Sequence, residues 1–204
     1  EEKFILASFL AQFGQDDEAL LLDQEAIKLD PLDPTGKIKY AKDLYNTDKF
    51  DEGIRVCHQL IKENPSLSGP YQFLFLCYAG KKQYEEAGKA LADYLELIGE
   101  KKLAALFSEN KFKVAIEKMF AFHSESKISF LERPIAKAIF YAYLEDKENT
   151  IKYMFEVYNN HEPQVSFFGG SRFDFIKDDQ RYLDFYEMTG FKAYYENKKM
   201  TENK

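Results

Sequence analysis

The chain has 204 residues, of which 45% are hydrophobic and 31% charged, with 19 Phe, 14 Tyr and no Trp. This many large apolar side chains can bury a sizeable core, since each is worth roughly 1.5–3 kcal/mol when buried, so disorder over most of the length is excluded. The net charge of −7 argues against a nucleic-acid-binding surface, which needs clustered Lys and Arg, and no apolar run approaches the ~18–20 residues that span a bilayer.

The first hundred residues contain a repeat. The small residues Ala19, Gly53 and Ala87 are 34 positions apart, and Pro31 and Pro65 are separated by the same interval. A small residue lets one helix approach its partner closely, and a proline ends a helix because it lacks an N–H. The pattern therefore predicts three helical hairpins over residues 1–33, 34–67 and 68–100.

The 34-residue period, together with Phe50 and Tyr84 at the turns, resembles the tetratricopeptide repeat (TPR) family. The resemblance implies an all-α, right-handed solenoid of helical hairpins that binds another protein or a peptide. Gly53 stands where the family usually has Ala, which costs about 1 kcal/mol in a helix interior, so Gly53→Ala is expected to be neutral or stabilising. Gly99 replaces the closing proline of the third hairpin and is expected to end its helix.

Two cysteines, Cys57 and Cys77, fall within predicted helices among apolar neighbours. Two residues are too few for a disulfide scaffold. They are expected to be reduced thiols in the core, with a disulfide between adjacent helices as the alternative.

Residues 101–170 are expected to form further degenerate TPR-like helices. Asn110 ends a Ser-Glu-Asn segment that could cap a helix beginning near Phe112, and Pro134 suits a first helical turn. Residues 145–148 resemble a turn between two more helices. We expect these segments to continue the repeats as one solenoid domain.

Residues 171–204 are expected to cap the array. The segment from Phe173 to Phe191 is similar to the end of TPR tails in bacterial winged-helix transcription regulators and class III adenylate cyclases, with Gln180 in place of the usual proline. Asp178 or Asp179 can cap a short helix, and Gly190 can end it. The aromatic residues expected to cover the last hairpin are Phe173, Phe175, Tyr182, Phe185 and Phe191.

Catalytic chemistry is not predicted. His58, His123 and His161 lie far apart and form no pair at metal-ligand spacing, and the Gly-Gly-Ser-Arg segment at 169–172 lacks the lysine of a phosphate-binding loop. We therefore expect no catalytic residues, no cofactor and no metal, and a protein that is not an enzyme.

A peptide-binding groove is expected on the inward face of the first helices of hairpins two and three. The candidate residues are Ile38, Lys42, Tyr45, Asn46, Gln72 and Leu76. Lys42 and Asn46 hint at a clamp for a carboxylate, but no basic residue continues the set into the third hairpin. Tyr45 has two readings, an aromatic anchor for a partner or a core residue between helices.

The functional expectation is a protein–protein interaction or sensory module, the C-terminal part of a larger bacterial regulator, that binds a partner or self-associates as a homodimer. A stand-alone scaffold and an enzyme with an unrecognised active site are the alternatives. The start at Glu1, without an initiator Met, indicates a processing site or a boundary within a longer product. Cytoplasmic placement is favoured, with the periplasm as the alternative if a membrane segment lies upstream.

Overall fold

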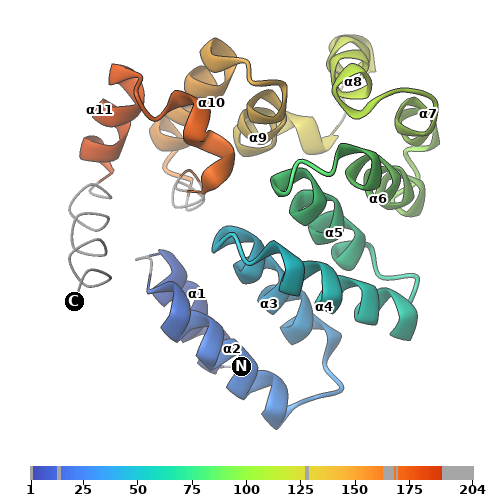
Figure 1. Ribbon diagram of the computed structural model, residues 1–204, viewed down its shortest axis with the longest axis vertical. Helices are drawn as coiled ribbons and strands as arrows, with labels where there is room; N and C mark the ends of the chain where they lie inside the picture. Colours follow the sequence, from blue (N-terminus) through green and yellow to red (C-terminus); the bar gives the residue numbers. More distant parts are fainter. Residues whose placement is uncertain (1, 13–14, 127–128, 163–167, 169, 190–204) are drawn as a thin grey trace. The chain divides into compact units, whose positions relative to one another are not determined.

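The computed structural model describes residues 2–12, 15–126, 129–162, 168 and 170–189, and these residues are helical with no strand (Figure 1). The α-helices are α1 (Glu2–Gln12), α2 (Asp16–Leu29), α3 (Pro34–Asn46), α4 (Phe50–Glu63), α5 (Ser68–Gly80), α6 (Tyr84–Leu97), α7 (Lys101–Glu109), α8 (Phe112–Ser126), α9 (Pro134–Leu144), α10 (Lys147–Asn159) and α11 (Gln180–Met188). Two 3₁₀ helices, η1 (Ser129–Glu132) and η3 (Ser171–Ile176), accompany them. The all-α helical-repeat solenoid is confirmed.

Two compact units divide the helices. The first contains α1 to α8, and the second contains η1, α9, α10, η3 and α11. The two units meet after Ser126. The division predicted from the sequence, with repeats over 1–100, degenerate helices over 101–170 and a cap over 171–204 in one continuous domain, stays a prediction.

The first unit follows the 34-residue repeat closely. The second helices of the first three hairpins begin at Asp16, Phe50 and Tyr84, each 34 positions after the last. Helix α2 ends two residues before Pro31, and α4 ends two residues before Pro65. Successive helices pack against one another along the chain from α2 to α7 (Figure 1). The repeat register predicted from the sequence is therefore that of the structure.

The small residues of the repeat lie at tight helix contacts. Ala19 and Ala87 are fully buried, and Gly53 is buried as well. A β-carbon on Gly53 would lie 2.7 Å from the Sγ atom of Cys77, which is closer than van der Waals packing permits. The structure therefore argues against a neutral or stabilising Gly53→Ala, because the Cys77 side chain would have to shift to make room for the methyl group.

Cys57 and Cys77 are free thiols, and both are fully buried. Burial raises the pKa of the Cys57 thiol well above its usual range, and the neighbouring Cys77 adds to this effect. A thiol held in its neutral form is a poor nucleophile. The reduced core thiols expected from the sequence are present, and no disulfide joins them.

Helix α7 begins in register but ends one turn early. It starts 33 positions after α5, yet it has 9 residues where α5 has 13. The Ser108 hydroxyl donates to the carbonyl oxygen of Ala104 (3.3 Å), and the Asn110 amide donates to that of Leu106 (2.8 Å). Asn110 was expected to cap the helix that follows, but its side chain closes the helix before it. The next helix, α8, therefore begins only 28 positions after α6.

The second unit is built on the α9–α10 hairpin, covered by η3 and α11. Phe173, Tyr182 and Phe185 are buried in its core, and Phe175 packs at the edge. The Tyr182 hydroxyl donates to the carbonyl oxygen of Phe168 (2.8 Å). The aromatic capping segment predicted from the sequence thus packs as expected, although Gly190 and Phe191 lie outside the described residues.

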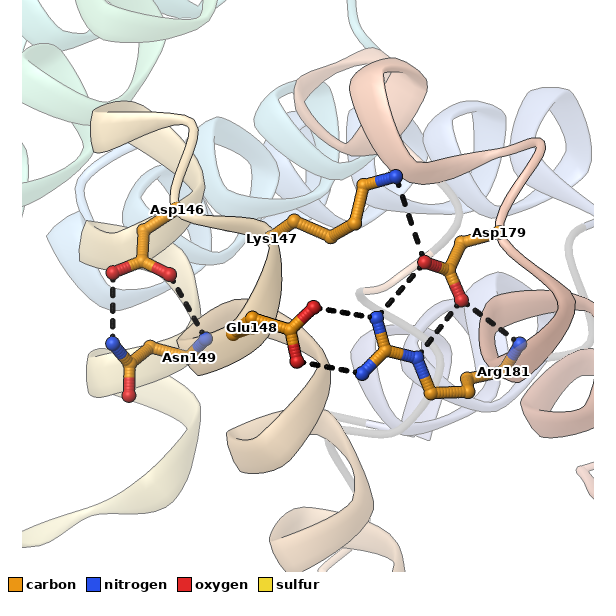
Figure 2. Close-up of polar contacts among 6 residues, drawn as sticks. All are labelled: Asp146, Lys147, Glu148, Asn149, Asp179 and Arg181. Atoms are coloured by element: carbon orange, nitrogen blue, oxygen red, sulfur yellow. Dashed lines mark hydrogen bonds and ion pairs between the residues drawn. The ribbon is translucent and has the colours of Figure 1, made fainter.

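Charged residues join the first turns of α10 and α11 (Figure 2). Asp179 caps α11 by accepting from the Arg181 backbone N–H (3.0 Å), and Asp146 caps α10 by accepting from Asn149 (3.0 Å). The Arg181 guanidinium makes two hydrogen bonds of 2.8 Å to Glu148 and further bonds to Asp179. One arginine therefore ties the capping helix to the hairpin beneath it.

Candidate binding site

The six residues expected to line a groove differ in burial. Ile38, Lys42, Asn46 and Gln72 are half-buried, whereas Tyr45 and Leu76 are only 2% and 6% exposed. The Tyr45 ring lies 6.2 Å from that of Phe50. Tyr45 and Leu76 therefore pack between helices, and only the other four of the set offer surface to a partner.

Two of these four make contacts within the first unit. The Ile38 side chain lies within 3.1 Å of the β-carbon position of Gly69 on the next hairpin. The Lys42 Nζ atom lies 3.4 Å from Oδ1 of the buried Asp43. The exposed part of the expected groove is thus small.

A hollow lies beside the end of α7, which is shorter than α5. Its volume is about 780 Å³, and it opens between α6, the end of α7 and the start of α8. It is lined by Tyr84, Glu85, Gly88, Lys89, Ala92, Asp93, Phe107, Ser108, Glu109, Asn110, Lys111, Phe112, Lys113 and Val114. We call this hollow the α6–α8 pocket.

The floor of the α6–α8 pocket is apolar. Tyr84, Gly88 and Ala92 follow one another at four-residue intervals along one face of α6. The Tyr84 ring stacks on Phe112 with centroids 5.6 Å apart and planes 12° apart, and Phe107 meets Phe112 at 6.0 Å. These rings wall an apolar hollow of fixed shape.

Gly88 lines the pocket without a side chain, which leaves space there. A β-carbon at this position would lie 3.8 Å from the carbonyl oxygen of Phe107 and 3.8 Å from Cδ2 of Phe112. Both are ordinary van der Waals distances, so an alanine fits there. A longer side chain at this position would extend into the hollow.

Charged side chains surround the opening. Lys89 donates to Glu85 (2.7 Å), and the Lys113 Nζ atom lies 5.6 Å from the centre of the Tyr84 ring. Lys111 is exposed on the turn between α7 and α8. Burial raises the pKa of Asp93, with a further contribution from Glu96. The rim thus carries charges of both signs around an apolar floor.

The local charge differs from that of the whole chain. Residues 101–126 hold five Lys and three Glu, so this hairpin is net positive, whereas the chain carries −7. An apolar floor with a charged rim is typical of sites that bind a side chain of a partner. Among the residues that the structure describes, no cluster of three or more His, Cys, Asp or Glu side chains could hold a metal ion.

The α6–α8 pocket was not predicted from the sequence. Its lining residues lie on α6, at the end of α7 and at the start of α8, and none belongs to the expected groove. The available signal was the spacing from Tyr84 to Phe112, which is 28 positions where the repeat requires 34. The Ser-Glu-Asn segment before it is a helix-ending composition that was assigned to the wrong helix.

Comparison with protein-family models, curated proteins and solved structures gives no match. Within the described part of the chain, no helix has both the length and the apolar character needed to cross a membrane.

Proposed function

We propose that this protein is a protein-binding helical-repeat module of the TPR type, and that the α6–α8 pocket receives an apolar side chain from a partner. The observation that carries the proposal is the hollow of about 780 Å³ beside the shortened α7, which apolar residues of α6, α7 and α8 line. A volume of about 780 Å³ falls within the roughly 300–1,000 Å³ of ordinary ligand sites. The likeness of the tail to those of bacterial regulators favours a place in a larger regulator.

The size of the gap favours a helical partner. Helix α7 is four residues shorter than α5, which corresponds to about one turn and about 6 Å of helix length. A single turn of helix from another chain matches that space. Such segments bind through apolar anchors spaced three or four residues apart, and Tyr84, Gly88 and Ala92 present a stripe with the same spacing.

The charge of the α7–α8 hairpin favours acidic residues beside the anchor. Lys111 and Lys113 lie at the opening together with Glu85, Asp93 and Glu109, and Lys101, Lys102 and Lys118 make the α7–α8 hairpin net positive. Attraction between these lysines and an acidic segment would speed its association and favour it over basic competitors. The partner segment is therefore an amphipathic helical turn with an apolar anchor and acidic neighbours.

A displayed library of random 16-residue peptides tests the proposal. Selection against the folded protein should enrich sequences that combine an aliphatic or aromatic anchor with Asp or Glu. Gly88→Leu should reduce the affinity of the enriched peptides at least tenfold, because its side chain would fill the floor. Gly88→Ala is the matched control, since its methyl group fits at 3.8 Å, and it should bind nearly as well as the wild type.

Two results would contradict the proposal. One is that no peptide is enriched. The other is that the enriched peptides bind Gly88→Leu as well as they bind the wild type. Sensitivity to Lys42→Ala and Gln72→Ala, with Gly88→Leu silent, would place binding on the groove face of α3 and α5 instead.

A further inference from the structure

Two acidic side chains are buried where the first hairpin meets the second. Asp23 on α2 is 0% exposed and Asp43 on α3 is 1% exposed. Among the described residues, none of their four carboxyl oxygens accepts a hydrogen bond of normal geometry, although Lys42 and Asn46 lie beside Asp43. The carboxyl groups are close enough to share a hydrogen bond if one of them carries a proton. Two buried carboxylates side by side, without that proton, would repel one another strongly.

The repeat shows what this position normally holds. Thirty-four residues after Asp23 and Asp43 come Cys57 and Cys77, and both of these thiols are fully buried. Another 34 residues after Cys57 comes Leu91, which is 1% exposed. At the junction of hairpins two and three, both positions are therefore core positions that hold uncharged side chains. At the first junction the same positions hold two ionisable groups.

Lys42 forms an ion pair with one of the two carboxyl groups. On α3, Lys42 lies 3.4 Å from Asp43, and Lys39 also acts on Asp23. Tyr40 accepts a hydrogen bond from Gln24 of α2 (2.6 Å) and donates one to Glu52 of α4 (2.8 Å). Glu52 adds a further acidic group on the α4 side. Lys42 is the cation that pairs directly with Asp43. An uncompensated second charge would cost several kcal/mol in this environment.

We propose that Asp23 and Asp43 form a proton-binding site that holds the first helical hairpin against the second. The pair keeps one shared proton, as an O–H···O⁻ hydrogen bond, while α2 and α3 are packed together. Opening of this junction exposes both carboxyls to water and releases the proton. Lys42, which also belongs to the expected groove, is the cation that accompanies the remaining negative charge.

The direction of the pKa shifts agrees with this arrangement. Burial, followed by the nearby Asp43, raises the pKa of Asp23 to about 8, and burial raises that of Asp43. In an unfolded chain an aspartic acid titrates near 3.9. The closed junction therefore retains a proton that the open form has lost, so its stability decreases as the pH rises from about 4 through the pKa of the closed state.

Carboxyl ¹³C NMR of the full chain, labelled at aspartate, tests the site directly. We expect one side-chain carboxyl resonance to titrate at neutral pH or above, and to be absent from the Asp23→Asn variant. In Asp43→Asn the remaining Asp23 should titrate at lower pH, because the neighbouring charge is gone. Titration of every aspartate below pH 5 would overturn the proposal. Stabilisation of the wild type by added Ca²⁺, lost in Asp23→Asn, would overturn it in favour of a cation site.

Thermal unfolding gives an independent readout. The melting temperature of Asp23→Asn relative to the wild type should increase between pH 5 and pH 9, because only the wild type binds the shared proton. Asp51→Asn is the matched control, since Asp51 is 83% exposed on its side chain and pairs with Lys81 at the surface. If the difference in melting temperature between Asp23→Asn and the wild type stayed constant with pH, the proposal would be contradicted.

Discussion

The Sγ atom of Cys77 lies 2.7 Å from the position that a β-carbon on Gly53 would occupy. Gly53 belongs to the second helix of hairpin two, and Cys77 to the first helix of hairpin three. The Cys77 thiol therefore occupies the space that any side chain at position 53 would need, which favours glycine there. A helix-propensity gain of about 1 kcal/mol from alanine is smaller than the overpacking that alanine would create.

Gly53→Ala is accordingly expected to destabilise the protein by about 1–3 kcal/mol. Cys77→Ala removes the Sγ atom and makes room for the new methyl group, so the double variant should be more stable than the sum of the single effects predicts. Urea unfolding of the four proteins in a double-mutant cycle measures this coupling. Additive effects would show that the two residues do not compete for the same space.

Tyr45→Ala should destabilise the protein by about 3 kcal/mol or more, because it empties a buried aromatic site. The side chain is 2% exposed and packs near Phe50. Gln72→Ala, at a half-buried position of the same expected groove, serves as the comparison and should leave the melting temperature nearly unchanged. An unaltered melting temperature for Tyr45→Ala would restore this tyrosine as an anchor for a partner.

Thr150→Val should raise the stability of the second unit by about 1 kcal/mol. Thr150 is fully buried, and its hydroxyl has no hydrogen-bond partner among the described residues, so the change removes an unsatisfied polar group with little change of shape. Thr150→Ser keeps the hydroxyl and loses the methyl group, and it should be less stable than the wild type. If calorimetry gives the opposite order, the hydroxyl has a partner in the folded protein.

Arg181→Ala should lower the melting temperature of the second unit at low salt, with a smaller decrease in 1 M NaCl, because the ion pairs with Glu148 and Asp179 are at the surface. These contacts hold the pKa of Asp179 well below its usual range. Their contribution is therefore present above the ordinary aspartate pKa, near 3.9, and is lost on acidification.

The matched control for Arg181→Ala is Lys177→Ala, which breaks an exposed pair between Lys177, just after η3, and Asp174. This variant leaves the contact between α10 and α11 (Figure 2) intact. If both variants change the melting temperature equally at every salt concentration, the connection made by Arg181 has no special role.

Much of the fold could be predicted because the repeat acts through local rules. Ala19 and Ala87 mark helix contacts, Pro31 and Pro65 mark helix ends, and Gly99 ends α6 with a φ of 87°. Each of these residues acts through its own backbone or its own small size. A pattern in the sequence is therefore sufficient to find them.

The remaining features depend on partners that are distant in sequence. The requirement for Gly53 depends on a thiol 24 positions later, and the buried Asp23 depends on Asp43, 20 positions later. An aspartate in an amphipathic helix is normally assigned to the solvent face, so nothing in the sequence of α2 alone placed Asp23 in the core. The α6–α8 pocket was missed for a related reason. It lies where α7 lacks the last helical turn that α5 has, and no residue marks a missing turn.

The pocket beside α6 is open because few residues separate Lys101 from Phe112, so that α7 ends early. A version of this chain with about four more residues before Asn110 would continue α7 by another turn and would fill the hollow with its own side chains. Such a protein would fill with its own residues the pocket that we propose receives a partner. A protein with an open pocket and one whose pocket is filled by its own α7 would then differ only by an insertion. Each residue on the floor of the pocket would be unchanged.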